Sequence, residues 1–212
     1  KEVSAPYGYV LSHEAVKFDV TEENSTEESG VTVVAVKLGN YAQKGIIKIS
    51  KTGEVFASVA AADGVYQPVY TVQGLAGATY EIKAAEDIYT PDGTLRCSAD
   101  EAVDTVTTGA DGMAESKPLY LGKYEITEMK APDGMVINKD AHTAELVYAG
   151  QEIEITETAA SFCNDRQKAR ISLSKVLEQN KQFGIGMNNE LSAVTFGFYA
   201  AEELTAADGS VI

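Results

Sequence analysis

The sequence predicts an all-β protein built from sandwich-like modules. Short runs rich in Val, Ile, Thr and Tyr recur between clusters of Gly, Pro, Asp and Asn, which is typical of strands joined by turns. The chain has 212 residues, enough for one large domain or one to two ordinary ones, and 44% of them are apolar. It can therefore bury a core, and an internal repeat indicates how that core is divided.

The repeat is clearest in one motif that occurs twice. KEVSAPYGYV opens the chain, and TEMKAPDGMV begins at Thr127. Both contain Glu, two residues, Ala-Pro, any residue and Gly, so Glu2 matches Glu128. A repeat of this length indicates modules arranged in a row. Two further pairs of segments align in the same way: residues 31–51 with 153–175, and residues 75–87 with 191–203.

The alignment divides the chain into one complete module and two partial ones. Residues 1–44 are the back half of a first module, residues 45–168 are a complete second module, and residues 169–212 are the front half of a third. The joints, residues 42–45 and 165–169, are short and polar, which predicts little slack between modules.

Strand and turn signals predict the layout of the complete module. Two stretches, residues 53–64 and 89–102, are expected to be loops. The second is acidic, but its carboxylates do not have EF-hand spacing, which favours a solvated loop over a calcium site. Frequent short strands favour a sandwich. The expected strands are residues 45–52, 67–72, 77–85, 102–107, 118–129, 142–148 and 152–163.

Charge and motif content exclude several classes of function. The net charge of −15 argues against nucleic acid and anionic membrane partners, since both require basic patches. No nucleophile elbow, metal-ligand spacing or phosphate loop is present, so we expect no turnover enzyme, cofactor or metal site. His13 and His142 are isolated. Cys97 and Cys163 are too few for a disulfide framework and could pair only if the fold brings them together.

Targeting signals give little information. No apolar run is long enough to span a membrane, and no signal peptide opens the chain. The chain starts and stops within its own pattern, as a segment of something longer would. We therefore expect no membrane contact in this segment.

Strand alternation places a polar residue on the apolar face of three strands. Lys51 follows two isoleucines at two-residue spacing, Glu128 follows Tyr and Ile, and Asn164 follows Phe. In the partial modules the same alternation points Asn40 and Lys175 inward. An inward charge is costly unless something compensates for it.

Three interpretations of these inward residues are open. Polar residues at strand ends often reach solvent, and lysine snorkels readily. A buried Lys–Glu ion pair, hydrogen-bonded by Asn164, is the second interpretation. The third is chemical, because a lysine buried in an apolar core tends to lose its proton and a glutamate to keep one.

In the chemical interpretation, Lys51 attacks the side-chain carbon of Asn164. A neutral amine is a nucleophile, and a protonated carboxyl can donate to an amide carbonyl and then shuttle protons. The reaction would release ammonia and leave an amide cross-link, once and without turnover. Fixed orientation supplies much of the rate.

At these residues the sequence resembles the CnaB-type (SpaA-like, prealbumin-like) domains of Gram-positive surface proteins and pilins. The matching motifs are KISKTG around Lys51, LAGATYEI, GKYEITEMKAPDGM around Glu128, and Asn164 at the end of the last strand. The resemblance covers essentially the whole chain. One departure is Met135, where the family has Tyr, although the first module keeps Tyr9.

The resemblance implies Greek-key β-sandwich modules (Ig-like/prealbumin-like) in tandem. It also implies an intramolecular isopeptide bond between Lys51 and Asn164, with Glu128 as the catalytic carboxyl and no cofactor. The equivalents in the incomplete modules are Glu2, Asn40 and Lys175. The implied role is a stalk or shaft module of an adhesin or pilus, on an extracellular protein anchored to the cell wall.

The expected partners are neighbouring modules of the same protein. The two partial modules are complementary, so they could also pair by strand complementation within or between chains. The alternative function is an adhesin module that recognises a host or partner protein. Its candidate contact residues are Tyr66, Tyr70, Tyr89 and Tyr148.

Overall fold

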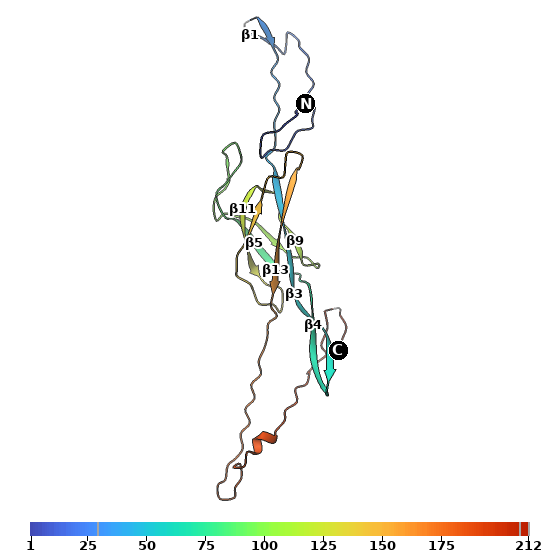
Figure 1. Ribbon diagram of the computed structural model, residues 1–212, viewed down its shortest axis with the longest axis vertical. Helices are drawn as coiled ribbons and strands as arrows, with labels where there is room; N and C mark the ends of the chain where they lie inside the picture. The colour runs from blue at the N-terminus through green and yellow to red at the C-terminus, as the bar shows by residue number, and fades with distance from the viewer. Residues whose placement is uncertain (29, 208, 212) are drawn as a thin grey trace. The chain divides into compact units, whose positions relative to one another are not determined.

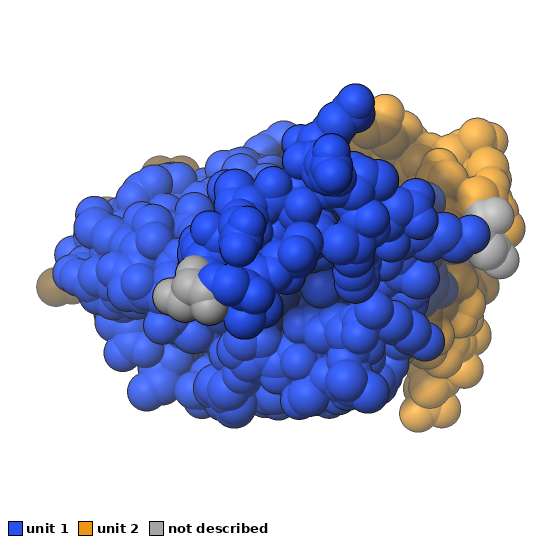
Figure 2. All heavy atoms as spheres, turned by 90° about the horizontal axis from the view of Figure 1, so that it is seen from above, with its two compact units in different colours: residues 1–53, 73–165 blue, residues 54–72, 166–212 orange. Residues whose placement is uncertain are grey.

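The computed structural model describes residues 1–28, 30–207 and 209–211. Residues 29, 208 and 212, which fall within the two predicted partial modules, lie outside this description. The chain divides into two compact units, coloured separately in Figure 2. Unit 1 holds residues 1–53 and 73–165, and unit 2 holds residues 54–72 and 166–212.

The regular structure is almost entirely β. The helical element is a short 3-10 turn, η1 (Glu190–Ala193), and no helix in the described ranges is long and apolar enough to cross a membrane. The strands are β1 (Thr26–Glu28), β2 (Val31–Val33), β3 (Lys44–Ala62), β4 (Val65–Gly74), β5 (Thr79–Ala84), β6 (Ile88–Tyr89), β7 (Leu95–Cys97), β8 (Ala102–Thr107), β9 (Met113–Glu115), β10 (Leu119–Tyr120), β11 (Gly122–Lys130), β12 (His142–Leu146) and β13 (Ile155–Asn164).

Two sheets build the sandwich. One has the order β10-β3-β13, with β4 and β9 also paired to β3, and the other has the order β12-β11-β5-β8. Their facing side chains form one core, which includes Ile47 and Ile49 from the first sheet and Tyr80, Ile82 and Ile126 from the second. Each fully buried side chain of this size contributes about 1.5–3 kcal/mol. The predicted all-β sandwich is confirmed.

Alternation along β3 is regular inside the sandwich. From Lys44 to Gly53 every second residue is buried, so Ile47, Ile49 and Lys51 all face the core. The same period buries alternate residues of β11 and β13 up to their polar ends. A two-residue period is the geometry of a strand with one face covered.

The first and last strands of the complete module, β3 and β13, are neighbours and run parallel, as Figure 1 shows. Lys51 lies opposite Phe162, and Asn164 lies opposite Gly53. A Cβ atom at Gly53 would come 2.6 Å from a methyl of Leu75 and 3.1 Å from the carbonyl oxygen of Asn164. Glycine therefore lets the end of β13 approach β3 closely.

The expected loop at residues 53–64 is wrong. β3 continues to Ala62 and turns into β4 through Asp63 and Gly64, which have φ values of 52° and 75°. Positive φ at both central residues, with the sequence Asp-Gly, is a two-residue hairpin turn. The sequence shows no alternation of apolar and polar residues in this hairpin because most of the hairpin is exposed, so neither of its faces has to be apolar.

Two other expected elements are refined. The expected loop at residues 89–102 contains β7, which pairs with β6. The expected strand at residues 118–129 is divided into β10 and β11, because Gly122 has φ 152° and packs against Ile88. The carboxylates of the acidic loop mostly cap backbone N–H groups, such as Asp87 to Ala99.

The N-terminal segment of unit 1 is fastened to the complete module through Gln43. Its buried side chain donates to the carbonyls of Gly150 and Ile153 and accepts from the N–H of Ala149 at 2.8 Å. Gln151 in turn accepts from the N–H of Ala5. The polar groups of the buried Gln43 side chain are therefore satisfied.

Unit 2 contains the outer part of the β3–β4 hairpin and the C-terminal segment. The Arg166 guanidinium lies 3.6 Å from the ring centre of Tyr70 and 2.8 Å from a carboxylate oxygen of Glu54. In the described residues beyond 165, backbone pairing is limited to isolated bridges such as Asn180–Ile185. Among the described residues beyond 165 no regular strand forms, so the front half of a third module stays a prediction.

Candidate functional site

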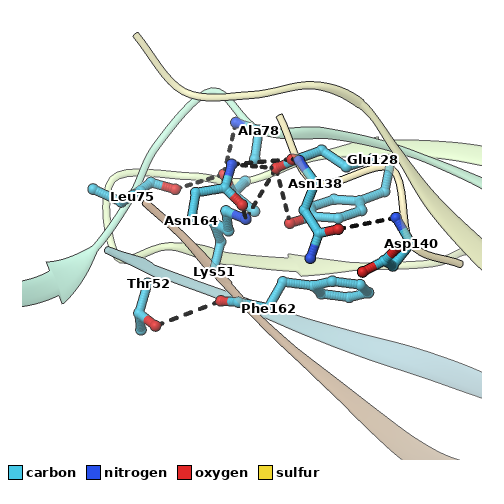
Figure 3. Close-up of polar contacts among 11 residues, drawn as sticks. Lys51, Thr52, Leu75, Ala78, Glu128, Asn138, Asp140, Phe162 and Asn164 are labelled. Atoms are coloured by element: carbon cyan, nitrogen blue, oxygen red, sulfur yellow. Dashed lines mark hydrogen bonds and ion pairs between the residues drawn. The ribbon is translucent and has the colours of Figure 1, made fainter. Parts of the chain in front are cut away.

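Three strands from both sheets converge on one buried polar cluster. Lys51 extends from β3, Glu128 from β11 and Asn164 from the end of β13, and Figure 3 shows the three side chains pointing toward one another. Their exposures are 1%, 3% and 3%. The inward orientation that alternation predicts is therefore observed, and the interpretation in which Lys51 reaches solvent is wrong.

The three side chains contact one another pairwise. Lys51 Nζ lies 3.0 Å from Glu128 Oε1 and also donates a hydrogen bond to Asn164 Oδ1. The amide nitrogen of Asn164 donates to both carboxylate oxygens of Glu128, at 2.9 and 3.0 Å. These contacts compensate the burial of two charges.

Further donors complete the environment of Glu128. The backbone N–H of Asn138 donates to Oε2 at 2.7 Å, and the Tyr80 hydroxyl lies 3.4 Å from Oε1. Burial, and then the negative charge of Glu128, raise the pKa of Tyr80 well above its usual value. Tyr80 therefore stays protonated as a donor to the carboxylate.

Aromatic rings shield the amine. The rings of Tyr80 and Phe162 lie 4.6 Å apart, and their centres are 5.9 and 6.0 Å from Lys51 Nζ. In the part of the chain that the structure describes, every buried side-chain N or O atom has a hydrogen-bond partner. The cluster is buried and internally satisfied, a setting in which electrostatic interactions are strong.

The position of Glu128 refines the chemistry expected from the sequence. Its carboxylate contacts the amide nitrogen of Asn164, whereas the carbonyl oxygen of Asn164 accepts from Lys51. Glu128 therefore contacts both the amine that the predicted reaction would deprotonate and the nitrogen that it would release.

The N-terminal segment contains a second Glu–Asn pair. The amide nitrogen of Asn40 donates to Glu2 Oε2 at 2.6 Å, and the N–H of Ser12 donates to the same oxygen at 2.8 Å. Glu2 and Asn40 are half-buried. Lys175, the third predicted equivalent, is exposed in unit 2.

The remaining candidate residues occupy ordinary positions. Cys97 and Cys163 are free. His13 lies 3.2 Å from Glu152, and the His142 ring packs against Phe162. Among the described residues, no group of three or more His, Cys, Asp or Glu side chains is placed to hold a metal ion.

The tyrosines proposed as contact residues differ in their surroundings. Tyr66 and Tyr89 are exposed. Tyr70 lies under Arg166, and Tyr148 packs against Tyr7 with ring centres 4.6 Å apart. Of these four tyrosines, Tyr66 and Tyr89 are therefore the ones exposed enough to contact a partner protein.

Sequence reasoning missed two members of the site, Tyr80 and Asn138. Tyr80 lies on a strand face that reads as plain core. Asn138 acts through its backbone, so its side chain gives no signal. The repeat did contain a signal for Asn138. In each copy of the motif, the backbone N–H that donates to the Glu carboxylate belongs to the residue ten positions later, Asn138 after Glu128 and Ser12 after Glu2.

Comparisons with known proteins agree with this fold. Residues 69–160 match the family model described as SpaA, prealbumin-like fold domain. A segment of 74 residues is 32% identical to the trypsin-resistant surface T6 protein of Streptococcus pyogenes serotype M6, covering 34% of this chain and 14% of that protein. The resemblance to SpaA-like domains that the motifs indicate is confirmed.

Two solved pilin structures are also similar. The minor pilin GBS52 of Streptococcus agalactiae is 16% identical, with a TM-score of 0.40, over 63% of this chain and 49% of that one. The shaft pilin SpaA of Lactobacillus rhamnosus GG is 15% identical, with a TM-score of 0.39, over 59% and 52%. The chain thus spans about half of each pilin and a seventh of the T6 protein.

Proposed function

We propose that the complete module, which matches the SpaA prealbumin-like family model over residues 69–160, is a structural stalk or shaft module of a Gram-positive surface adhesin or pilus. An autocatalytic isopeptide bond between Lys51 and Asn164 stabilises it, and Glu128 is the catalytic carboxyl. The observation that carries the proposal is the burial of these three side chains in one closed set of contacts.

The proposed reaction balances without a cofactor. Lys51 gives a proton to Glu128, and the neutral amine attacks Cγ of Asn164. The Nζ–Cγ bond forms, Glu128 delivers the first proton to Nδ2 and takes a second one from Nζ, and the Cγ–Nδ2 bond breaks, so the nitrogen leaves as ammonia and Glu128 keeps one proton. Because the groups are already in contact, orientation supplies much of the rate. The module changes once and does not turn over, so it is not an enzyme in the usual sense.

The strand arrangement explains why such a bond suits a stalk. Tension enters the module at the start of β3 and leaves at the end of β13, and these strands lie side by side. A bond from Lys51 to Asn164 would carry the load directly from one strand to the other. The chain between Lys51 and Asn164, which are 113 residues apart, would then not be stretched under load.

Force spectroscopy of the complete module in a series of identical modules tests this function. With the bond in place, the chain between Lys51 and Asn164 stays folded or slack under load. With Asn164→Ala, unfolding should release about 3.5 Å for each of the 113 residues of separation, or roughly 400 Å. A wild-type module that releases this same length would contradict the stalk proposal.

The partners and location follow from the same proposal. The T6 protein is named a surface protein, and we place this chain on an extracellular, wall-anchored protein as well. Its partners are neighbouring modules of the same protein, and the partial modules pair with each other by strand complementation. The buried joint at Gln43 supports a stiff array.

A second function, recognition of a host or partner protein, is favoured by one observation. The outer β3–β4 hairpin presents exposed apolar side chains, including Val65, Tyr66 and Val72. Exposed apolar groups gathered on one element are typical of interaction sites.

A further inference from the structure

We propose that Tyr80 and the backbone N–H of Asn138 are positioning groups for the cross-linking reaction. They hold the carboxylate of Glu128 so that one oxygen, Oε1, transfers the protons while the other, Oε2, stays anchored. This inference rests on the proposed cross-linking chemistry. It adds a division of tasks between the two oxygens and two groups that take no part in bond making or breaking.

The two oxygens of Glu128 have different partners. Oε1 lies 3.0 Å from Lys51 Nζ and accepts from Asn164 Nδ2 at 2.9 Å, so it contacts both the nitrogen that must lose protons and the nitrogen that must gain one. Oε2 accepts its shortest hydrogen bond, 2.7 Å, from the N–H of Asn138. Figure 3 shows Lys51, Asn138 and Asn164 gathered around the carboxylate of Glu128.

A glutamate carboxylate needs such an anchor because its last torsion is soft. The χ3 angle of glutamate has broad preferences, so an unrestrained carboxylate of Glu128 would turn about its own axis. Turning would tilt Oε1 away from the two nitrogens, and the rate of an intramolecular reaction depends on the alignment of the reacting groups. Asn138 on Oε2 and the Tyr80 hydroxyl, 3.4 Å from Oε1, restrain the carboxylate at both of its oxygens.

Tyr80 is suited to remain a hydrogen-bond donor throughout the reaction. It is fully buried on β5, with its ring against Phe162. Burial, and then the negative charge of Glu128, raise the pKa of Tyr80 well above its usual value. The hydroxyl therefore keeps its proton, and it holds Oε1 without acting as a base itself.

Asn138 is placed by the loop between β11 and β12, residues 131–141. In this loop the N–H of Val136 donates to the carbonyl of Asp165 at 2.8 Å. Asp165 directly follows Asn164 in the chain. The same loop thus holds both the carboxylate and the strand end that carries the amide.

The same anchor occurs in the N-terminal segment, with a different residue. The N–H of Ser12 donates to Glu2 Oε2 at 2.8 Å, and the amide nitrogen of Asn40 donates to that oxygen at 2.6 Å. Ser12 follows Glu2 by ten positions, as Asn138 follows Glu128. A donor that recurs at the same spacing with another side chain acts through its backbone.

The test measures how fast folded chains lose ammonia. Full-length chains are recovered in urea before the bond has formed, which the unmodified intact mass confirms, and are then diluted into buffer. Tyrosine fluorescence follows folding, and the intact mass of acid-quenched samples follows the bond. A change that only weakens the fold alters the folded fraction but not the rate at which folded molecules react.

Tyr80→Phe removes the hydroxyl and keeps the ring that shields Lys51. Because the hydroxyl contact is long, its loss should slow ammonia release roughly two- to twelvefold, the effect of one neutral hydrogen bond. Tyr124→Phe is the matched control. Tyr124 is equally buried, but its hydroxyl donates to the carbonyl of Tyr120 at 2.6 Å, outside the cluster, so this variant should react at the wild-type rate.

Asn138→Pro tests the backbone anchor, because proline has no N–H. Its hydrogen bond is short and goes to a charged group, so its loss should slow the reaction about ten- to a hundredfold. Lys139→Pro is the control in the same loop. Lys139 is exposed, and its N–H makes no hydrogen bond with the residues that the structure describes. If Asn138→Pro does not fold, the two tyrosine variants still decide.

The outcomes separate this inference from the proposed function. Equal rates for folded Tyr80→Phe and Tyr124→Phe would overturn the positioning role while leaving the cross-link in place. A folded Asn138→Pro that reacts as fast as Lys139→Pro would overturn it as well. A wild-type chain that folds without losing ammonia would instead remove the cross-link itself, and this inference with it.

Discussion

Glu128→Gln is expected to prevent the cross-link and to destabilise the complete module strongly. Glutamine keeps the shape of the side chain but cannot accept the proton of Lys51 or deliver one to the departing nitrogen. Lys51 would then be buried without a counter-charge, and breaking a buried ion pair costs about 3–5 kcal/mol. The variant should show the unmodified intact mass and a lower midpoint of thermal unfolding.

Glu125→Gln is the matched control. Glu125 lies on the same strand as Glu128, but on the opposite face of β11, which is exposed to solvent. It should retain the wild-type mass deficit and melt close to the wild type. If Glu128→Gln still loses ammonia, the carboxyl has no catalytic role and the mechanism is wrong.

Asn164→Ala is expected to remove the bond while leaving Lys51 and Glu128 paired. The bond closes a loop of about 113 residues, and chain-entropy estimates for cross-links of this size give about 4–5 kcal/mol. For a module of this size the unfolding midpoint should fall by roughly 10–20 °C. Differential scanning calorimetry measures this shift.

Cys163→Ala controls for a change at the end of β13. Cys163 is exposed and adjacent to Asn164, but it points away from the cluster. This variant should keep the bond and nearly all of the stability. If Asn164→Ala melts within a few degrees of this control, a noncovalent ion pair accounts for the cluster better than a cross-link.

The sequence was most informative where one face of a strand is buried. Two-residue alternation correctly pointed Lys51, Glu128 and Asn164 into the core, because a strand that buries its apolar neighbours has no freedom to turn one residue outward. The repeat strengthened this prediction, since the same alternation recurs at Asn40 and Lys175. The motif around Glu128 then indicated the family.

What the sequence could not predict depends on tertiary contacts. Alternation does not specify which strands are neighbours, so the parallel pairing of β3 and β13 appears only in the folded module. Tyr80 reads as a core residue, and its hydroxyl contact with Glu128 depends on how two sheets face each other. The outward extension of β3 was missed because the β3–β4 hairpin is largely exposed, so burial imposes no alternation of apolar and polar residues on it.

The intact mass of the wild-type chain, followed by peptide mapping, tests the central claim most directly. We expect a deficit of one ammonia, with the peptides that contain Lys51 and Asn164 joined. An unmodified mass, with those peptides separate, would contradict the cross-link. The complete module would then be a β-sandwich with a buried ion pair, and recognition of a partner protein would become the leading function.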